Sequence, residues 1–169
     1  MGPLAELVAK QAIEEGLYTY CRSIDRMDRG LAESIWHPGA RADYGAFFQG
    51  DSGGLLDRIW TLHATLETHA HHVTNKVIEV LSVDRAVAES YVIVMLRLRR
   101  ASDIWLDQIL SVRYFDRWST RDGATWKLDE RRSNRDLLTQ IKCTHSPDWL
   151  PSRRDTLDPS YGYFEKRFR

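Results

Sequence analysis

Histidines carry the clearest chemical signal in this 169-residue sequence, which contains six of them. Three lie in the segment Thr-His-Ala-His-His at residues 68–72. Side chains alternate between the two faces of a strand, so His69 and His71 would share one face and His72 the other. If the shared face borders a pocket, two imidazoles meet a bound molecule. A neutral imidazole near pH 7 is suited to act as a general base.

Two other interpretations of this pattern stay open. The histidines could be partly buried and satisfied by hydrogen bonds inside the protein. Alternatively, His69 and His71 could supply two metal ligands and Asp25 a third. The sequence has no second motif of spaced Cys or His residues to complete such a site. We therefore expect neither a metal nor another cofactor.

Two carboxylates, Asp25 and Asp28, lie where the first predicted helix ends. The helix dipole disfavours negative charge at a C-terminus, so the dipole does not explain them. One of them could hold a histidine in a fixed tautomer, or both could be solvated acids beside neighbouring arginines. Asp25 follows Cys21 by four residues and Asp28 follows it by seven, so both fit the apolar stripe of the helix. Spacing does not choose between them.

The elements that must position these groups divide the chain into a helical first half and a strand-rich second half. Helical periodicity predicts helices over residues 4–26, 27–36 and 55–66. Pro38-Gly39 is expected to stop the second helix, before a short strand or hairpin. β-branched residues predict strands at about 69–82, 85–101, 104–118 and 124–136.

This order predicts an α+β fold, in which a strongly curved antiparallel sheet wraps around the N-terminal helices as a cone with a central pocket. The length suits one domain, which we place at residues 1–140. Residues 141–169 would form a C-terminal extension that packs on the pocket mouth or on a neighbouring subunit.

Composition narrows the class of protein. Lys plus Arg and Asp plus Glu both number 24, which argues against a nucleic-acid binder. Mean hydropathy is −0.46, and no apolar run approaches the roughly 20 residues of a membrane span. We find no secretory signal and only two cysteines, which favours a cytoplasmic protein with free thiols.

Aromatic residues are frequent, with six Trp, seven Tyr and five Phe. Beyond filling the core, they can line an apolar pocket for a hydrophobic small molecule. We expect Trp36, Phe48 and Trp105, together with His69, to contact such a substrate.

Three segments carry a resemblance to a known family. In order and spacing they resemble the SnoaL-like branch of the nuclear transport factor 2-like superfamily, especially its dehydratase and dehydrohalogenase members. The resemblance covers about residues 5–137 and implies an α+β cone. The segments are YCRSIDRMDRGLAESIWHPGARADYGAFFQG, THAHHVTNKVIEVLSVDRAVAESYV and WKLDERRSNRD.

The resemblance implies an Asp–His dyad and further catalytic side chains. The family's Asp matches Asp25, and its His, four residues before the Asn of a Thr-Asn pair, matches His71. Two pocket tyrosines match Tyr20 and Tyr44.

An arginine on the last strand is also implied by the resemblance. Inner-face parity with Trp126 and Leu128 favours Arg132 as the catalytic arginine. A bulge in that strand would substitute Arg131.

We thus expect a lyase without a cofactor, which eliminates water, hydrogen halide or an aldehyde such as formaldehyde from an aromatic or polycyclic small molecule. An isomerase or cyclase with the same dyad is the alternative within enzymes. A binding protein, or an accessory subunit such as the small subunit of a ring-hydroxylating dioxygenase, is the alternative outside them. The open sheet favours a homodimer or homotrimer, because pairing with a copy buries its outer face.

Overall fold

The structure is a computed structural model that describes residues 1–101, 104–143 and 153–164. Within these ranges the chain forms helices and strands in an α+β order. Their bounds are α1 Pro3–Asp25, α2 Arg29–Ser34, β1 Trp36–Asp43, β2 Gln49–Asp51, α3 Ser52–His63, β3 Leu66–Val80, β4 Arg85–Ala101, β5 Ile104–Thr120, β6 Trp126–Cys143 and α4 Ser160–Tyr163.

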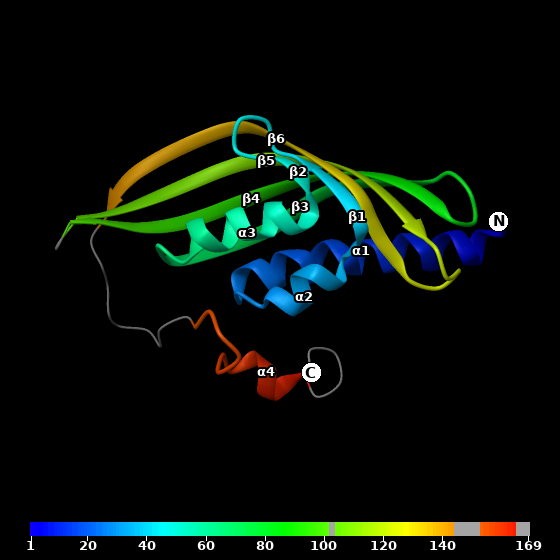
Figure 1. Ribbon diagram of the computed structural model, residues 1–169, viewed down its shortest axis with the longest axis horizontal. Helices are drawn as coiled ribbons and strands as arrows, with labels where there is room; N and C mark the ends of the chain where they lie inside the picture. Colours follow the sequence, from blue (N-terminus) through cyan, green and yellow to red (C-terminus); the bar gives the residue numbers. More distant parts are fainter. Residues whose placement is uncertain (102–103, 144–152, 165–169) are drawn as a thin grey trace.

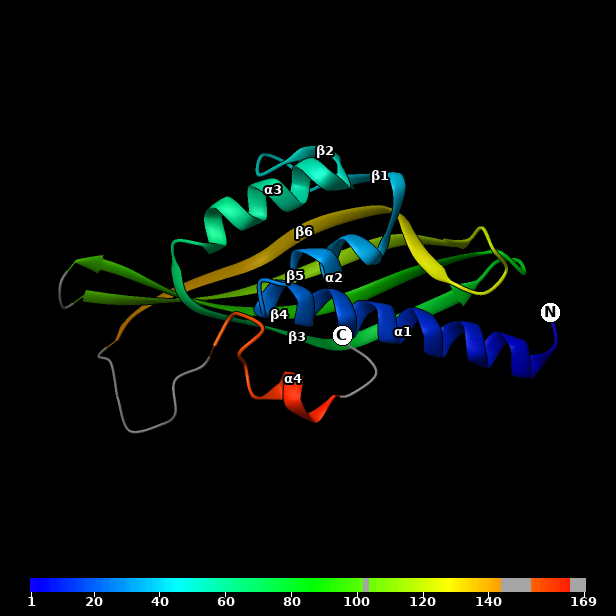
Figure 2. The same ribbon diagram turned by 60° about the horizontal axis from the view of Figure 1, so that its bottom comes forward.

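The strands form one sheet in the order β2-β1-β6-β5-β4-β3. Neighbouring strands are antiparallel except for β1 and β6, which run parallel. The sheet curves over α1, α2 and α3, which lie along its inner face (Figures 1 and 2). The predicted α+β cone is therefore confirmed, with a sheet that stays open at β2 and β3.

The helix α1 lies against the sheet because one of its faces is apolar. Ile13, Leu17, Tyr20 and Ile24 recur at intervals of three or four residues and are buried. Met27 then adopts a left-handed backbone conformation with φ of 52°, which separates α1 from α2. This reversal leaves Asp25 at the very end of α1, facing the sheet.

The predicted stop at Pro38-Gly39 is wrong. Trp36, Pro38 and Gly39 belong to β1. The pairing of β1 with β6 shifts between Trp36 and Arg41, and Gly39 has φ of 77°. A local irregularity of this kind lets a strand contain a proline and a left-handed glycine.

The ends of the chain differ from the predicted boundaries. β6 runs on to Cys143, so the first residues of the expected extension belong to the sheet. Residues 144–152 and 165–169 of that extension lie outside the described residues. Residues 153–164 pack beside α1, with α4 on the side of α1 away from the sheet (Figures 1 and 2). In the described ranges, none of the helices is long and apolar enough to cross a membrane.

The contact between α1 and β5 yields a first prediction. A Cβ on Gly16 would lie 2.8 Å from the buried Trp118 ring. We expect Gly16→Ala to lower the free energy of unfolding by about 1–3 kcal/mol, because overpacking outweighs the better helix propensity of Ala. Gly30→Ala in α2 is the control, since its Cβ would meet only Asp28 Oδ1 at 3.9 Å. Urea denaturation measures both. Equal stability of Gly16→Ala and the wild type would show that the ring is free to move.

Candidate active site

Asp25 and His71 form a hydrogen-bonded pair where the end of α1 meets β3. Asp25 Oδ1 lies 2.7 Å from His71 Nδ1, and Asp25 Oδ2 accepts from the His71 backbone N–H at 3.0 Å. An ionised carboxylate can only accept hydrogen bonds, so Nδ1 carries the ring proton in this pair. Nε2 of neutral His71 is then free to accept a proton. The His71 side chain is only 7% exposed and the Asp25 side chain 14%, which shields the interaction from water.

Asp28 has a different task from Asp25. Its carboxylate caps α2 by accepting from the Leu31 backbone N–H at 3.0 Å. It also accepts from the Tyr161 hydroxyl at 2.8 Å. The structure therefore assigns the cap to Asp28 and the histidine contact to Asp25, a choice that helical spacing left open.

A cavity of about 620 Å³ opens beside His71, between the helices and the inner face of the sheet. This size is typical of small-molecule sites, and the lining is largely apolar and aromatic. The aromatic and aliphatic lining residues are Tyr20, Tyr44, Phe47, Tyr114, Ile24, Ala46, Ile59, Leu62, Val94, Leu96, Leu110 and Val112. The polar ones are His63, His71, Gln108, Ser133, Arg58 and Arg135.

Three tyrosines meet at this cavity, of which Tyr20 and Tyr114 are buried and Tyr44 is half-buried. The hydroxyls of Tyr20 and Tyr44 lie 3.3 Å apart, and the Tyr114 ring lies 6.3 Å from both other rings. Burial raises the pKa of all three phenols, so they stay protonated and can donate hydrogen bonds to a bound molecule. The resemblance predicts Tyr20 and Tyr44 at this site, but it does not predict Tyr114. Its alternation with Val112 on the inner face of β5 was the available signal.

The arginine that approaches these tyrosines is Arg131, and the predicted inward orientation of Arg132 is wrong. The pairing of β5 with β6 shifts by one residue at Asp129, which reverses the alternation beyond it. Arg131 is consequently fully buried. The Arg132 side chain is 65% exposed and lies 3.4 Å from Asp43.

Arg131 forms a buried ion pair with Asp116 of β5. Two guanidinium nitrogens each lie 2.7 Å from a carboxylate oxygen, and both side chains are fully buried. The guanidinium carbon lies 4.4 Å from the Tyr20 ring centroid and 4.1 Å from that of Tyr114. A permanent positive charge thus sits against two cavity tyrosines, and Asp116 prevents it from being an unpaired buried charge.

The predicted contact of His69 with a substrate is wrong, because both of its ring nitrogens have partners within the protein. Its Nε2 lies 2.7 Å from the Ile24 carbonyl oxygen, to which it donates. Its Nδ1 lies 3.4 Å from Arg154 Nη1. Both ring nitrogens of this 4% exposed residue have partners, and His69 does not line the cavity.

The second imidazole at the cavity is His63, at the end of α3. Its ring centroid lies 4.4 Å from that of His69 and 6.2 Å from that of His71. Burial lowers its pKa to about 2, so His63 is neutral. Within the described part of the chain, its Nδ1 is buried without a hydrogen-bond partner. His63 follows Ile59 by four residues on the buried stripe of α3, and this spacing is the signal in the sequence that points to it.

The three aromatic side chains expected to contact a substrate lie elsewhere. Trp36 is buried in the core, edge-on to Tyr20 at 6.1 Å. Phe48 packs over Gly54, whose Cβ would lie 2.9 Å from its ring, while its neighbour Phe47 lines the cavity. Trp105 alternates with the inward-facing residues of β5 and so points to the outer face of the sheet. Its ring centroid lies 5.5 Å from the guanidinium carbon of Arg99. Local alternation and packing against glycines turn these rings away from the cavity.

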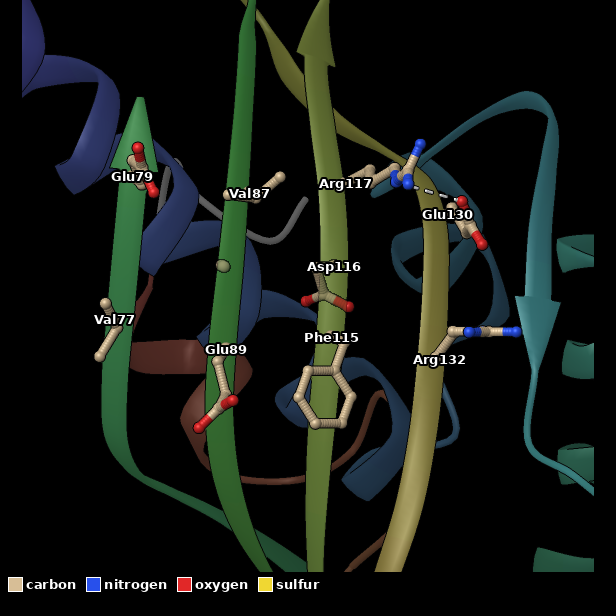
Figure 3. Close-up of a pocket in the computed structure, with 10 residues that line it drawn as sticks. Val77, Glu79, Val87, Glu89, Phe115, Asp116, Arg117, Glu130 and Arg132 are labelled. Carbon is tan, nitrogen blue, oxygen red and sulfur yellow. Dashed lines mark ion pairs between the residues drawn. The ribbon is translucent and has the colours of Figure 1, made fainter. Parts of the chain in front are cut away.

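A second hollow, of about 370 Å³, lies on the outer face of the sheet (Figure 3). It is lined by charged side chains around an apolar floor. Glu79 and Glu89 lie on the β3–β4 side, and Arg117 and Arg132 lie on the β5–β6 side together with Glu130, which pairs with Arg117 (Figure 3). None of its lining residues is a histidine or cysteine, so this hollow offers no imidazole for proton transfer.

Potential metal ligands and cysteine thiols are further reactive groups in the described ranges. No set of three or more His, Cys, Asp or Glu side chains there is arranged to hold a metal ion. Cys21 and Cys143 are both free. Burial raises the pKa of Cys21 to about 12, which keeps this thiol protonated.

Comparison with known proteins identifies the family to which this chain belongs. The sequence profile of the SnoaL-like domain matches residues 5–132. No curated protein matches the sequence.

Solved structures show the same fold at low sequence identity. A hexachlorocyclohexane dehydrochlorinase is 20% identical with a TM-score of 0.75, over 88% of this chain and 100% of that one. A candidate scytalone dehydratase from Novosphingobium aromaticivorans is 20% identical with a TM-score of 0.71, over 86% and 97%. The β subunit of a candidate aromatic-ring-hydroxylating dioxygenase from the same species is 21% identical with a TM-score of 0.64, over 79% and 93%. These identities establish the fold and leave the activity open.

The buried His63 yields a prediction for acid stability. Its folded pKa of about 2 lies below the ordinary value of 6.5, so only the unfolded chain takes up this proton between those values. The free energy of unfolding must then fall as the pH drops below 6.5, by up to about 1.4 kcal/mol per pH unit. Urea denaturation from pH 7 to 4 should give a shallower dependence for His63→Phe. The exposed His72→Phe is the control and should match the wild type. Parallel curves for His63→Phe and the wild type would contradict a neutral His63.

Proposed function

The chain belongs to the SnoaL-like domain family, and we propose that it is a cofactor-independent lyase that acts on a hydrophobic small molecule. The observation that carries this proposal is the Asp25–His71 hydrogen bond at the wall of a largely apolar cavity. A pure binding pocket needs no carboxylate fixed to an imidazole. A general base needs both its orientation and its tautomer set.

In the first step His71 Nε2 removes a proton from carbon or oxygen of the substrate. The electron pair of the broken bond forms a new double bond as the leaving group departs. Asp25 keeps the Nδ1 proton in place and stabilises the imidazolium that forms. A positioned base of this kind is typically worth about 10²- to 10⁴-fold in rate.

The leaving group needs a hydrogen-bond donor on its own side of the cavity. Tyr20 and Tyr44 remain protonated and can donate to a departing hydroxyl or halide, or to a developing oxyanion. The Arg131 guanidinium lies against the Tyr20 ring, so it stabilises the negative charge that develops on this phenol while it donates to the leaving group. Loss of water is the default outcome. If the base takes a hydroxyl proton instead, the carbonyl of an aldehyde forms as a carbon–carbon bond breaks. The electron pair of that bond stays on the remaining carbon, to which the His71 imidazolium returns the proton.

The lining favours an aromatic or polycyclic substrate. Tyr44, Phe47 and Tyr114 offer ring faces, and Val94 and Leu110 offer aliphatic surface from the sheet. A cavity of about 620 Å³ has room for more than one ring. A neutral His63 beside the base could exchange hydrogen bonds with a substrate hydroxyl.

We also place the protein in the cytoplasm, as its sequence suggests.

The proposal is tested by comparing His71→Gln with His72→Gln. The enzyme is incubated with chelator and without cofactor, on a panel of hydroxylated and halogenated aromatic and alicyclic compounds. Mass spectrometry reads the products. We expect the wild type and His72→Gln to release a small neutral molecule at similar rates, because His72 is exposed. His71→Gln should be slower by about 10²- to 10⁴-fold.

Other results would point to other functions. A product of unchanged mass, formed only when His71 is present, would replace the lyase by an isomerase or cyclase. Equal turnover by both variants would contradict the base role of His71. Binding of the panel compounds without turnover by the wild type would favour a binding or accessory subunit.

The outer face of the sheet supports the further proposal of a homodimer or homotrimer. Tyr91, Ile93 and Met95 project from β4 and are 37–45% exposed. The hollow described above has Glu79 and Glu89 on β3–β4, and Arg117 and Arg132 on β5–β6, where Glu130 lies 3.4 Å from Arg117 (Figure 3). A second copy turned by a two-fold axis would bring unlike charges together around this apolar strip.

Charge placed on this strip should break the assembly. We expect Ile93→Glu to shift the protein toward the 19.7 kDa monomer in sedimentation velocity, because burying a carboxylate in the interface is costly. Leu7→Glu changes an exposed apolar position on α1, away from the outer face of the sheet, and should leave the assembly intact. An Ile93→Glu protein with the wild-type sedimentation coefficient would place the contact elsewhere.

A further inference from the structure

The segment 153–164 lies beyond the residues that match the SnoaL-like domain. Its side chains contact the end of α1 that carries Asp25. Arg26, next to Asp25, lies 3.3 Å from Asp158. Arg22, three residues earlier, donates to Ser160 at 2.9 Å. The Tyr161 hydroxyl donates to Asp28, three residues later. The neighbours of Asp25 on both sides are therefore held by this one segment.

The same segment reaches the histidine cluster through Arg154. Its guanidinium donates to the His63 carbonyl at 2.7 Å and to the Leu66 carbonyl at 2.5 Å. Arg154 Nη1, which donates to the His63 carbonyl, also lies 3.4 Å from His69 Nδ1. A guanidinium has only donors, so His69 Nδ1 must be the unprotonated ring nitrogen. The proton of His69 is then on Nε2.

That proton is the one donated to the Ile24 carbonyl at 2.7 Å. The Ile24 carbonyl belongs to the peptide that links Ile24 to Asp25. His69 and His71 lie two residues apart on β3, so one strand holds both the backbone and the carboxylate of Asp25. Arg154 fixes the tautomer that makes the first of these bonds possible.

We infer that Arg154 is a positioning residue for the Asp25–His71 pair, acting through His69 and Ile24. The C-terminal segment is thereby part of the active site, although the described residues that touch the cavity come from the domain itself. The effect on turnover rests on the proposed function. The effect on the two histidines does not.

The experiment compares Arg154→Ala with Arg153→Ala in the full-length protein. Arg153 is the matched control, because it is 46% exposed and pairs with Asp155. Nuclear magnetic resonance of ¹⁵N-histidine-labelled protein gives two readouts without any substrate. They are the titration midpoint of His69 and the chemical shift of the His71 Nδ1 proton.

We expect Arg154→Ala to raise the His69 midpoint, because a nearby positive charge has been removed, and to move the His71 Nδ1 proton resonance. Arg153→Ala should change neither. On any substrate of the wild type, Arg154→Ala should lower kcat by about 10- to 100-fold with little change in KM. Arg154→Lys keeps the charge with a single donor group and should fall between the two. It also replaces Arg154→Ala if that variant is poorly folded.

An unchanged His71 Nδ1 proton in Arg154→Ala would overturn the inference, whatever happens to His69. So would a kcat equal to that of Arg153→Ala. If the wild type turns over none of the compounds, the proposed function fails, and the two resonances still decide whether Arg154 positions the pair.

Discussion

The hydrogen bond between Asp25 and His71 is the contact on which the rest of this structure depends. A carboxylate at the C-terminus of a helix is disfavoured by the helix dipole, so it needs partners outside the helix. Asp25 finds them in the side chain and the backbone N–H of one strand residue. This joins α1 to β3 and fixes the corner of the cavity. It also leaves one ring nitrogen of His71 free for chemistry.

The cavity combines this base with a positive charge that never meets water. Arg131 is held by Asp116 and covered by the rings of Tyr20 and Tyr114. Breaking such a pair leaves a buried charge, which typically costs about 3–5 kcal/mol. The charge therefore stays in place. Tyr20 and Tyr114 lie between it and the cavity, where their hydroxyls can donate hydrogen bonds. The base comes from β3, and the donors proposed for the leaving group come from α1 and from the segment that follows β1.

Sequence reasoning predicted the long elements because their periodicity extends over many residues. α1 and the strands β3 to β6 lie close to their predicted positions, and the Asp25–His71 pair lies where the resemblance implied. The choice between Asp25 and Asp28 required the left-handed turn at Met27. The exchange of Arg132 for Arg131 required the bulge at Asp129. Both are single-residue backbone events, which alternation and helical spacing do not record.

The central claim concerns where one proton resides on His71. It is tested most directly by the side-chain ¹⁵N spectrum of the wild type and of Asp25→Asn at neutral pH. The geometry predicts a wild-type His71 that carries its proton on Nδ1 alone, and a loss of this tautomer preference in Asp25→Asn. A wild-type His71 protonated on Nε2 would contradict the account, because that nitrogen could then not act as the base.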